Sequence, residues 1–239
     1  MPESRKYYDL LMQDIRFEEG LNACMNCGVC TAICPAAEFY NYDPRQIVDI
    51  VQSGDSSEIE KLLKSETIWY CGECMSCKTR CPRGNTPAFI VQSLRTLSQK
   101  LGYFTESEKG RQQFAIKRTV GENIFKYGYC VASYAVTPEM HPEQGPIWEY
   151  MIQNSSDVFG RLGGKIDEYG EGPLRKIPEE TRDELKRIFD VTGGTDFFNL
   201  IESYSKEKAE EMGMGFDDEG IGNEYFKKVF SSNNGKHSH

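Results

Sequence analysis

The sequence predicts a mainly α-helical fold, and three observations point to it. The 36 residues between Cys34 and Cys71 (35–70) contain helix start and stop signals and apolar residues at helical spacing. The stretch that follows Cys81 shows the same features. The segment 6–15 also has apolar side chains at helical intervals. They are Tyr7, Leu10, Leu11 and Ile15.

Two helices are expected between Cys34 and Cys71. Asp43 and Pro44 supply an N-cap and a proline at the first helical position, and Gly54 is a stop signal. A capping box of Ser57 and Glu60 then opens the second helix. Each helix has one apolar face, formed by Ile47, Val48, Ile50 and Val51 in the first and by Ile59, Leu62 and Leu63 in the second. The segment therefore reads as a pair of amphipathic helices.

Further helices are expected after Cys81. One opens at 85–87 and ends at Gly102, with an apolar set of Phe89, Ile90, Leu94 and Leu97. Another covers 110–134. Residues 1–136 are therefore expected to form one α-helical domain.

The chain changes character beyond Thr137, where glycine and proline become frequent. Short helices are expected over 179–191, 196–212 and 224–230. Their apolar residues do not suggest an independent core. We therefore expect residues 137–239 to form a C-terminal extension of short helices and loops that wraps the helical domain or binds a partner subunit.

Eight of the nine cysteines fall into two runs with the spacing C-x2-C-x2-C-x3-C-P. The first run is Cys24, Cys27, Cys30 and Cys34, and the second is Cys71, Cys74, Cys77 and Cys81. This is the spacing of bacterial ferredoxins with two clusters. Three cysteines at two-residue gaps can wrap one corner of a cubane, while the fourth is directed away. The chain is therefore expected to bind two [4Fe–4S] clusters and to transfer electrons.

The fourth cysteine of each run ligates the other cluster in such proteins. We therefore expect one cluster to be held by Cys24, Cys27, Cys30 and Cys81, and the other by Cys71, Cys74, Cys77 and Cys34. Each run then supplies a ligand to both clusters, which holds them close. Lys78, Arg80 and Arg83 are expected beside the second of these clusters. There they either form a solvated basic patch or raise its potential and steer an acidic partner to it.

Zinc is the alternative for the two runs, because structural zinc sites also use cysteine. Such sites commonly use separated cysteine pairs, so two complete runs that each end in Cys-Pro fit zinc poorly. Cys130 stands apart among aromatic residues and is expected to be a small buried apolar side chain, with a redox role or a partner contact as the alternative.

Charge and composition exclude several classes of partner. The formal net charge of −9 disfavours nucleic acid and anionic lipid. No apolar run approaches the roughly 18 residues that cross a bilayer, and the first six residues lead into no apolar signal region. Because many cysteines in a reducing compartment favour metal binding over disulfides, we expect a cytoplasmic protein without direct membrane insertion.

The chain resembles the C-type iron–sulfur subunit of heterodisulfide reductases and heterodisulfide-reductase-like complexes, which has an α-helical ferredoxin domain. The two runs carry this resemblance, together with Trp69-Tyr70 before Cys71 and the segment 81–84 that leads into the helix with Leu94-Arg95. It covers about residues 15–130. The resemblance implies a non-catalytic subunit that relays single electrons between a flavin-containing A-type subunit and a catalytic B-type subunit that converts disulfides or thiols.

Motifs of the partner subunits are absent from this sequence. It contains no Cys-Cys-Gly, no G-x-G-x-x-G and no recognisable nucleophile–base pair, so no catalytic residue is expected. Two other functions stay open: the iron–sulfur subunit of a quinone-linked dehydrogenase, and a zinc-binding scaffold. The length beyond Thr137 fits the complexes of sulfur-oxidising prokaryotes better than the methanogen enzyme.

Overall fold

The computed structural model describes residues 5–131, 136–138, 140–141, 144–166 and 168–232, and within these residues it contains helices and no strand. The mainly α-helical class is therefore confirmed. The chain divides into two compact units. The first contains residues 5–113, 203–214 and 228–232, and the second contains the described residues of 114–202 together with 215–227.

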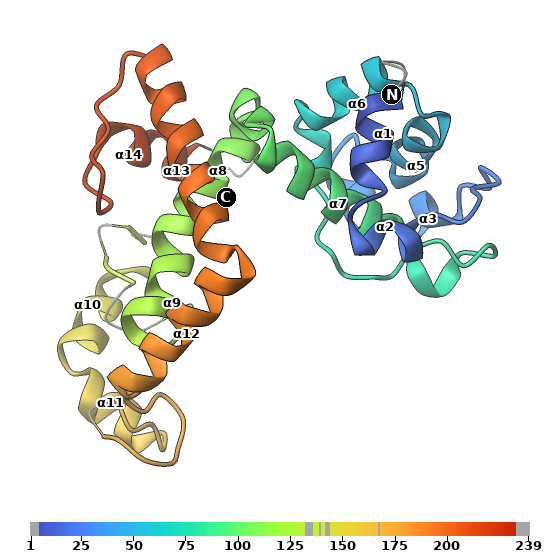
Figure 1. The fold of residues 1–239 in the computed structure, drawn as a ribbon. Helices are drawn as coiled ribbons and strands as arrows, with labels where there is room; N and C mark the ends of the chain where they lie inside the picture. The colour runs from blue at the N-terminus through green and yellow to red at the C-terminus, as the bar shows by residue number, and fades with distance from the viewer. Residues whose placement is uncertain (1–4, 132–135, 139, 142–143, 167, 233–239) are drawn as a thin grey trace. The chain divides into compact units, whose positions relative to one another are not determined.

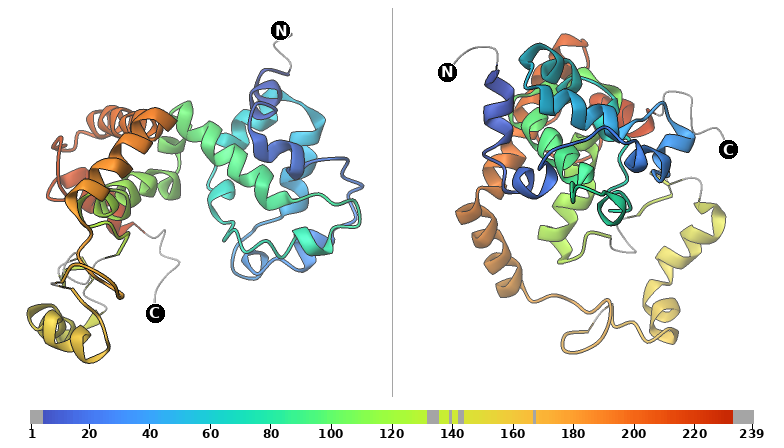
Figure 2. Two further views of the ribbon diagram at one scale, coloured as in Figure 1. Left: turned by 60° about the horizontal axis from the view of Figure 1, so that its bottom comes forward. Right: turned by 90° about the vertical axis from the view of Figure 1, so that its right-hand side faces the viewer.

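The first unit is built around α7 (Pro87–Lys100), which contacts several other helices (Figures 1 and 2). These are α1 (Lys6–Leu11), α2 (Ile15–Gly20), α5 (Pro44–Ser53) and α6 (Ser56–Leu63). Their apolar faces form one core that includes Leu11, Phe17, Ile47, Val51, Ile59, Leu63, Ile90 and Leu94. Shorter elements complete the unit: α3 (Val29–Ala32), α4 (Ala36–Phe39), the 3-10 turns Thr67–Trp69, Lys78–Arg80 and Tyr103–Glu106, and the start of α8 (Glu108–Ile116).

The ends of α5 are confirmed. The Asp43 side chain accepts hydrogen bonds from the backbone N–H groups of Arg45 and Gln46, and Gly54 ends the helix at a φ of 72°. The capping box at Ser57 is wrong, because α6 begins at Ser56, two residues before the start that a Ser57 cap predicts. Its cap is Asp55, whose side chain accepts from the N–H groups of Ser57 and Glu58.

The expected helix over 6–15 is broken into α1 and α2. The Asp14 side chain accepts a hydrogen bond from the N–H of Arg16 and thereby starts α2 as a new helix. Ile15, counted in the apolar set, is 86% exposed because it follows this break. Periodicity alone did not reveal the break, since Asp14 fits a helical pattern as well as a cap.

The second unit places α9 (Glu122–Tyr127) beside α12 (Glu179–Thr192), as Figure 1 shows. The rings of Phe125 and Phe189 meet edge to face, with centroids 4.7 Å apart. The expected helix over 110–134 consists of α8, a π-helical turn (Lys117–Gly121) and α9, and ends at Gly128; residues 132–134 lie outside the described residues. The other helices are α10 (Pro146–Gln153), α11 (Ser155–Arg161) and the first halves of α13 (Gly194–Glu211) and α14 (Glu224–Ser231), whose second halves belong to the first unit.

A buried ion pair lies in the second unit. The Arg118 side chain is fully buried and donates to both carboxylate oxygens of Glu202, at 2.8 and 2.6 Å. Two further N–H groups donate to the carbonyl oxygens of Asp217 and Gly220, so four hydrogen bonds satisfy most of the buried guanidinium.

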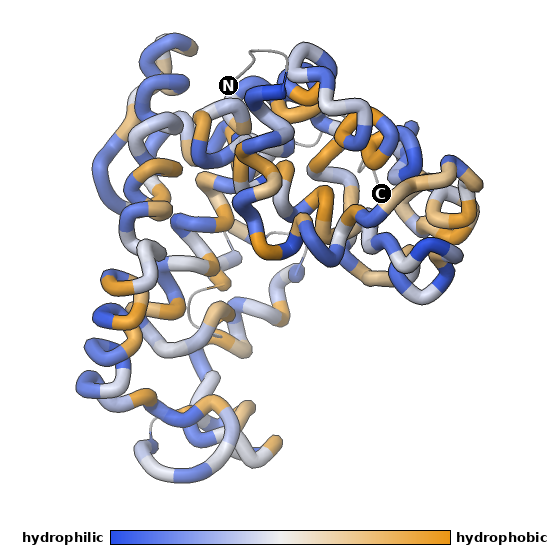
Figure 3. Tube along the Cα trace, turned by 45° about the vertical axis from the view of Figure 1, so that its right-hand side comes forward, coloured by the Kyte–Doolittle hydropathy of each residue, from blue (hydrophilic) through white to orange (hydrophobic). Residues whose placement is uncertain are grey.

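Hydrophobic and hydrophilic stretches alternate along the helices of both units, as amphipathic helices require (Figure 3). None of the helices in the described part of the chain combines the length and the apolar character needed to cross a membrane.

Candidate metal centres

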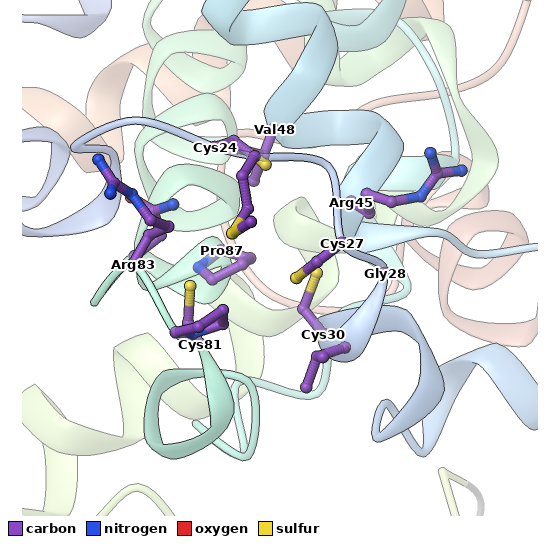
Figure 4. A pocket seen from close by; sticks show the side chains of 13 residues that line it. Cys24, Cys27, Gly28, Cys30, Arg45, Val48, Cys81, Arg83 and Pro87 are labelled. Carbon is purple, nitrogen blue, oxygen red and sulfur yellow. The ribbon is translucent and has the colours of Figure 1, made fainter.

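The cysteines of the two runs line two pockets of about 370 Å³ each, both open to solvent. The first pocket contains Cys24, Cys27, Cys30 and Cys81, and the second contains Cys71, Cys74, Cys77 and Cys34. Figure 4 shows the four sulfur atoms of the first pocket around one space. The fold thus brings the last cysteine of each run to the first three cysteines of the other run.

The two ligand loops share an unusual backbone conformation. The second residue after the first cysteine is left-handed in both, Asn26 at a φ of 59° and Glu73 at 54°. The fourth residue is left-handed as well, Gly28 at 80° and Met75 at 59°. In each loop the N–H of the second residue donates to the sulfur of the first cysteine at 3.4 Å. Matching left-handed positions in two sequences indicate that one loop geometry is required at both pockets.

A helix side chain holds the first cysteine of each run. Gln52 at the end of α5 exchanges two hydrogen bonds with the backbone of Cys24, at 2.6 and 3.2 Å. Arg95 in α7 donates to the carbonyl oxygen of Cys71 at 2.6 Å. Arg95 also bonds the Ile68 carbonyl oxygen at 2.7 Å and the Glu73 carboxylate at 2.6 Å. These braces fix the loops from the helical core.

Gln52 and Arg95 occupy equivalent positions in an internal repeat. The two cysteine runs are offset by 47 residues, and α5 and α7 are offset by 43. The two offsets differ by four residues because the first half contains the four-residue helix α4. No equivalent helix occurs among the described residues 82–86. The sequence analysis did not identify either residue. Aligning the two helices at their first residues, Pro44 and Pro87, would have shown that Gln52 and Arg95 are equivalent.

Equivalent wall positions carry different side chains. The first pocket is lined by Arg45, Arg83 and Asn85, and the second has Ala88, Ala36 and Tyr42 at the matching positions. The expectation that Arg83 lies beside the second cluster's cysteines is therefore wrong. Arg83 follows Cys81, and Cys81 crosses to the first pocket, so the residues after it go there too.

Partial burial raises the pKa of three cysteine thiols in the two pockets. It raises the pKa of Cys30 to about 11 and also raises the pKa of Cys71 and Cys77 above the usual range. At Cys74, hydrogen bonding with Ser76 lowers the pKa instead. The thiols of Cys30, Cys71 and Cys77, which are partly buried, are thus not ionised by the protein alone, whereas a bound metal deprotonates its thiol ligands outright. This is the chemistry of metal ligands and not of activated nucleophiles.

The donor set fits a cubane better than a single ion. Each pocket offers four cysteines and no histidine or carboxylate. Among all described residues, no three His, Cys, Asp or Glu side chains converge closely enough to hold one metal ion. The sulfurs instead surround a pocket whose remaining wall is largely apolar, with Val48 and Pro87 in the first and Pro44 and Ala88 in the second.

Cys130 takes no part in either pocket. It was expected to be buried, but it is exposed in the stretch after α9 ends at Gly128. The aromatic residues around it in the sequence pack elsewhere, as Phe125 does against Phe189.

Comparison with known proteins identifies the cofactors. Residues 20–85 match the family model of a 4Fe-4S dicluster domain. The C subunit of the ferredoxin:CoB-CoM heterodisulfide reductase from Methanosarcina acetivorans is 32% identical over 89% of this chain and 78% of its own length. The iron-sulfur C subunit of the CoB–CoM heterodisulfide reductase from Methanopyrus kandleri is 34% identical over 65% of this chain and 83% of its own.

The match to the Methanosarcina protein extends over most of the chain, so the residues beyond Thr137 do not separate this chain from methanogen subunits. The two pockets and the dicluster model together show a protein with two [4Fe–4S] clusters. The similarity over most of both chains establishes that this chain belongs to the family of C-type heterodisulfide reductase subunits, which are iron–sulfur electron-transfer subunits.

Proposed function

We propose that this chain relays single electrons between a flavin-containing A-type subunit and a catalytic B-type subunit of a heterodisulfide-reductase-like complex in the cytoplasm. The observation that carries the proposal is the pair of pockets, each with four cysteines and built from both runs. A cubane with four cysteine ligands has no open iron position for a substrate sulfur. The disulfide chemistry then belongs to the partner.

The crossed ligand sets are part of this proposal. Cys24, Cys27, Cys30 and Cys81 would hold one [4Fe–4S] cluster, and Cys71, Cys74, Cys77 and Cys34 the other. Both sets coincide with the cysteines that line one pocket each. When bound, the clusters supply one-electron chemistry. The backbone N–H groups of Asn26 and Glu73 stabilise negative charge on the Cys24 and Cys71 sulfurs.

We also propose that the C-terminal extension, residues 137–239, binds a partner subunit. Its described helices leave large apolar side chains exposed, among them Ile147 (63%), Leu162 (77%) and Val191 (84%). Ile147 is in α10 and Leu162 follows α11. We expect a partner subunit to cover these exposed apolar side chains.

Reconstitution tests the relay. The isolated chain, loaded with clusters, should accept and donate single electrons but show no disulfide reduction. Turnover should appear only when a B-type subunit is added together with a flavin subunit or an artificial dye as donor. Turnover by the isolated chain would overthrow the relay. Reduction of a quinone by an assembled complex would favour the iron–sulfur subunit of a quinone-linked dehydrogenase.

Deletion of residues 146–161 tests the extension more sharply than deletion of everything beyond Thr137. Residues 203–214 belong to the first unit, where Tyr204 packs against Gly102, so their loss would damage the cluster unit itself. The shorter deletion removes only α10 and α11. Loss of partner binding with both clusters retained is expected. Unchanged assembly would refute the role given to these helices.

A further inference from the structure

The internal repeat allows the surfaces of the two pockets to be compared position by position. The segment 78–83, which leads into the first pocket, contains Lys78, Arg80 and Arg83. The equivalent residues of the segment 31–36, which leads into the second pocket, are Thr31, Ile33 and Ala36. Three cationic positions in one half are thus matched by uncharged residues in the other.

Two of these cations are not neutralised. Arg80 and Arg83 are exposed, and within the described residues neither forms an ion pair. Lys78 lies 3.7 Å from Glu19, and Arg45, on the opposite side of the first pocket from Arg83, is paired with Asp43 at 2.9 Å (Figure 4). The second pocket has no charged lining residue, and the nearby Glu73 is bound by Arg95. An excess of positive charge therefore accompanies only the first pocket.

The edge of the first pocket is also open to a partner. Cys27 is exposed, and Met25 between the first two cysteines is 60% exposed. Arg83 lies at this pocket, so its charge acts within about one Debye length, near 8 Å at physiological salt, of anything that reaches the sulfurs. On a chain whose formal net charge is −9, this face is a local exception.

We propose that the first-pocket face, defined by Met25, Cys27 and Arg83 and flanked in the sequence by Arg80, docks a carboxylate-rich surface of an electron-transfer protein. The inference rests on the proposed relay and adds which face meets an acidic partner. One electron passes between the two proteins, so one is oxidised and the other reduced, and no bond or proton is transferred. Complementary charge at such a rim raises the association rate and is weakened by salt. A nucleic acid is disfavoured because the patch has only two free cations on an acidic chain.

Electron transfer to carriers of opposite charge tests the proposal. The full chain with both clusters, reduced anaerobically, is mixed with a flavodoxin of net negative charge or a cytochrome c of net positive charge, and the carrier's reduction is followed by stopped flow. The rate with flavodoxin should fall as salt is raised. Arg83→Glu should lower the rate with flavodoxin severalfold at low salt and weaken its salt dependence. The same variant should raise the rate with cytochrome c.

Ile33→Glu is the matched control, because it introduces the same carboxylate into the segment that leads into the second pocket, at an exposed residue that is equivalent to Arg80 and lines neither pocket. It should leave the flavodoxin rate within about twofold, since the acidic carrier does not dock there. Equal effects of Arg83→Glu and Ile33→Glu, or a flavodoxin rate that rises with salt, would overturn the proposal. An Arg83-dependent affinity for a short DNA duplex that exceeds that for flavodoxin would also overturn it.

Arg80→Glu provides a second variant in case Arg83→Glu loses a cluster. It should change the rates in the same direction, with both cluster EPR signals intact. No A-type or B-type subunit is present in these assays. Failure of the relay therefore leaves the result unaffected, and the two proposals fail separately.

Discussion

The two cysteine pockets share one backbone geometry but are held by different side chains. Both loops place left-handed residues at the same two positions and donate an N–H to the first cysteine sulfur. The helix residue behind them is a neutral Gln52 in one half and a triply bonded Arg95 in the other. The loop conformation is thus the common requirement, while the bracing and the charge around each pocket are free to differ. Two chemically identical clusters can thereby have different stabilities and potentials.

The largest expected difference comes from exchanging the crossing ligands. Cys81→Ser should disturb the cluster in the pocket of Cys24, and Cys34→Ser the cluster in the pocket of Cys71, because each sulfur lines that pocket. Iron content should fall from about eight toward about four per chain in each variant. EPR spectra of the reduced proteins identify which signal is lost.

Cys130→Ser is the control for these variants, since Cys130 is exposed and lies in neither pocket. It should retain both signals. Loss of the same signal in Cys81→Ser and Cys77→Ser would contradict the crossed assignment.

The next largest difference is expected between the two residues that hold the loops, Arg95 and Gln52. Arg95→Ala removes three hydrogen bonds from a largely buried guanidinium and should lower the free energy of unfolding by about 2–3 kcal/mol. Gln52→Ala removes two bonds at an exposed site and should cost about 1 kcal/mol. A chelator should remove iron faster from the cluster of Cys71 in Arg95→Ala, and faster from the cluster of Cys24 in Gln52→Ala. EPR spectra recorded during the release show which cluster is lost. Release at the same cluster in both would disprove the pairing of these braces.

The starts of α5 and α7 offer a smaller contrast. Asp43 caps α5 through its side chain, whereas Thr86 makes no side-chain cap bond to α7. Asp43→Ala should therefore cost about 1 kcal/mol, and Thr86→Ala much less. Denaturant unfolding of the two variants measures the difference, and equal losses would show that the cap of α5 has no special role.

The Asp43 contribution should also depend on pH. Burial raises the pKa of Asp43, but hydrogen bonds from Thr31 and Arg45 outweigh it and hold the pKa below its usual value. A depressed folded-state pKa stabilises the fold above the unfolded value, about 3.9, and this stability is lost as pH falls through the folded pKa. In Asp43→Asn the free energy of unfolding should therefore fall less as the pH is lowered. An unchanged pH profile would show that Asp43 is not its source.

The smallest effect concerns the left-handed positions. Gly28→Ala should destabilise the first loop by about 1 kcal/mol, because a Cβ at a φ of 80° is strained although its nearest neighbour there is 3.9 Å away. Met75→Gly should change stability by less than this, since glycine relieves the strain at 59° but loosens the unfolded chain. Thermal unfolding of the two variants measures these changes in stability. A large loss of stability in Met75→Gly would show that the Met75 side chain contributes packing.

Local signals predicted what local forces control. The two cysteine runs indicated two clusters because ligand spacing depends on a few neighbouring residues. The ends of α5 followed from Asp43, Pro44 and Gly54, whose backbone preferences need no tertiary partner. At Ser57 the same reasoning failed, because Asp55 caps the helix two residues earlier through the N–H groups of Ser57 and Glu58, and a sequence does not show which of two candidate caps prevails.

The sequence by itself thus determined the cluster type, the helical class and the family resemblance. Only the tertiary structure decided that Arg83 lies at the first pocket, that Gln52 and Arg95 hold the two loops, and that Cys130 is exposed. The physical reason is distance along the chain. Ligand spacing and helix caps act over about four residues, whereas these features depend on how Cys81 crosses between the runs and on how α5 and α7 pack.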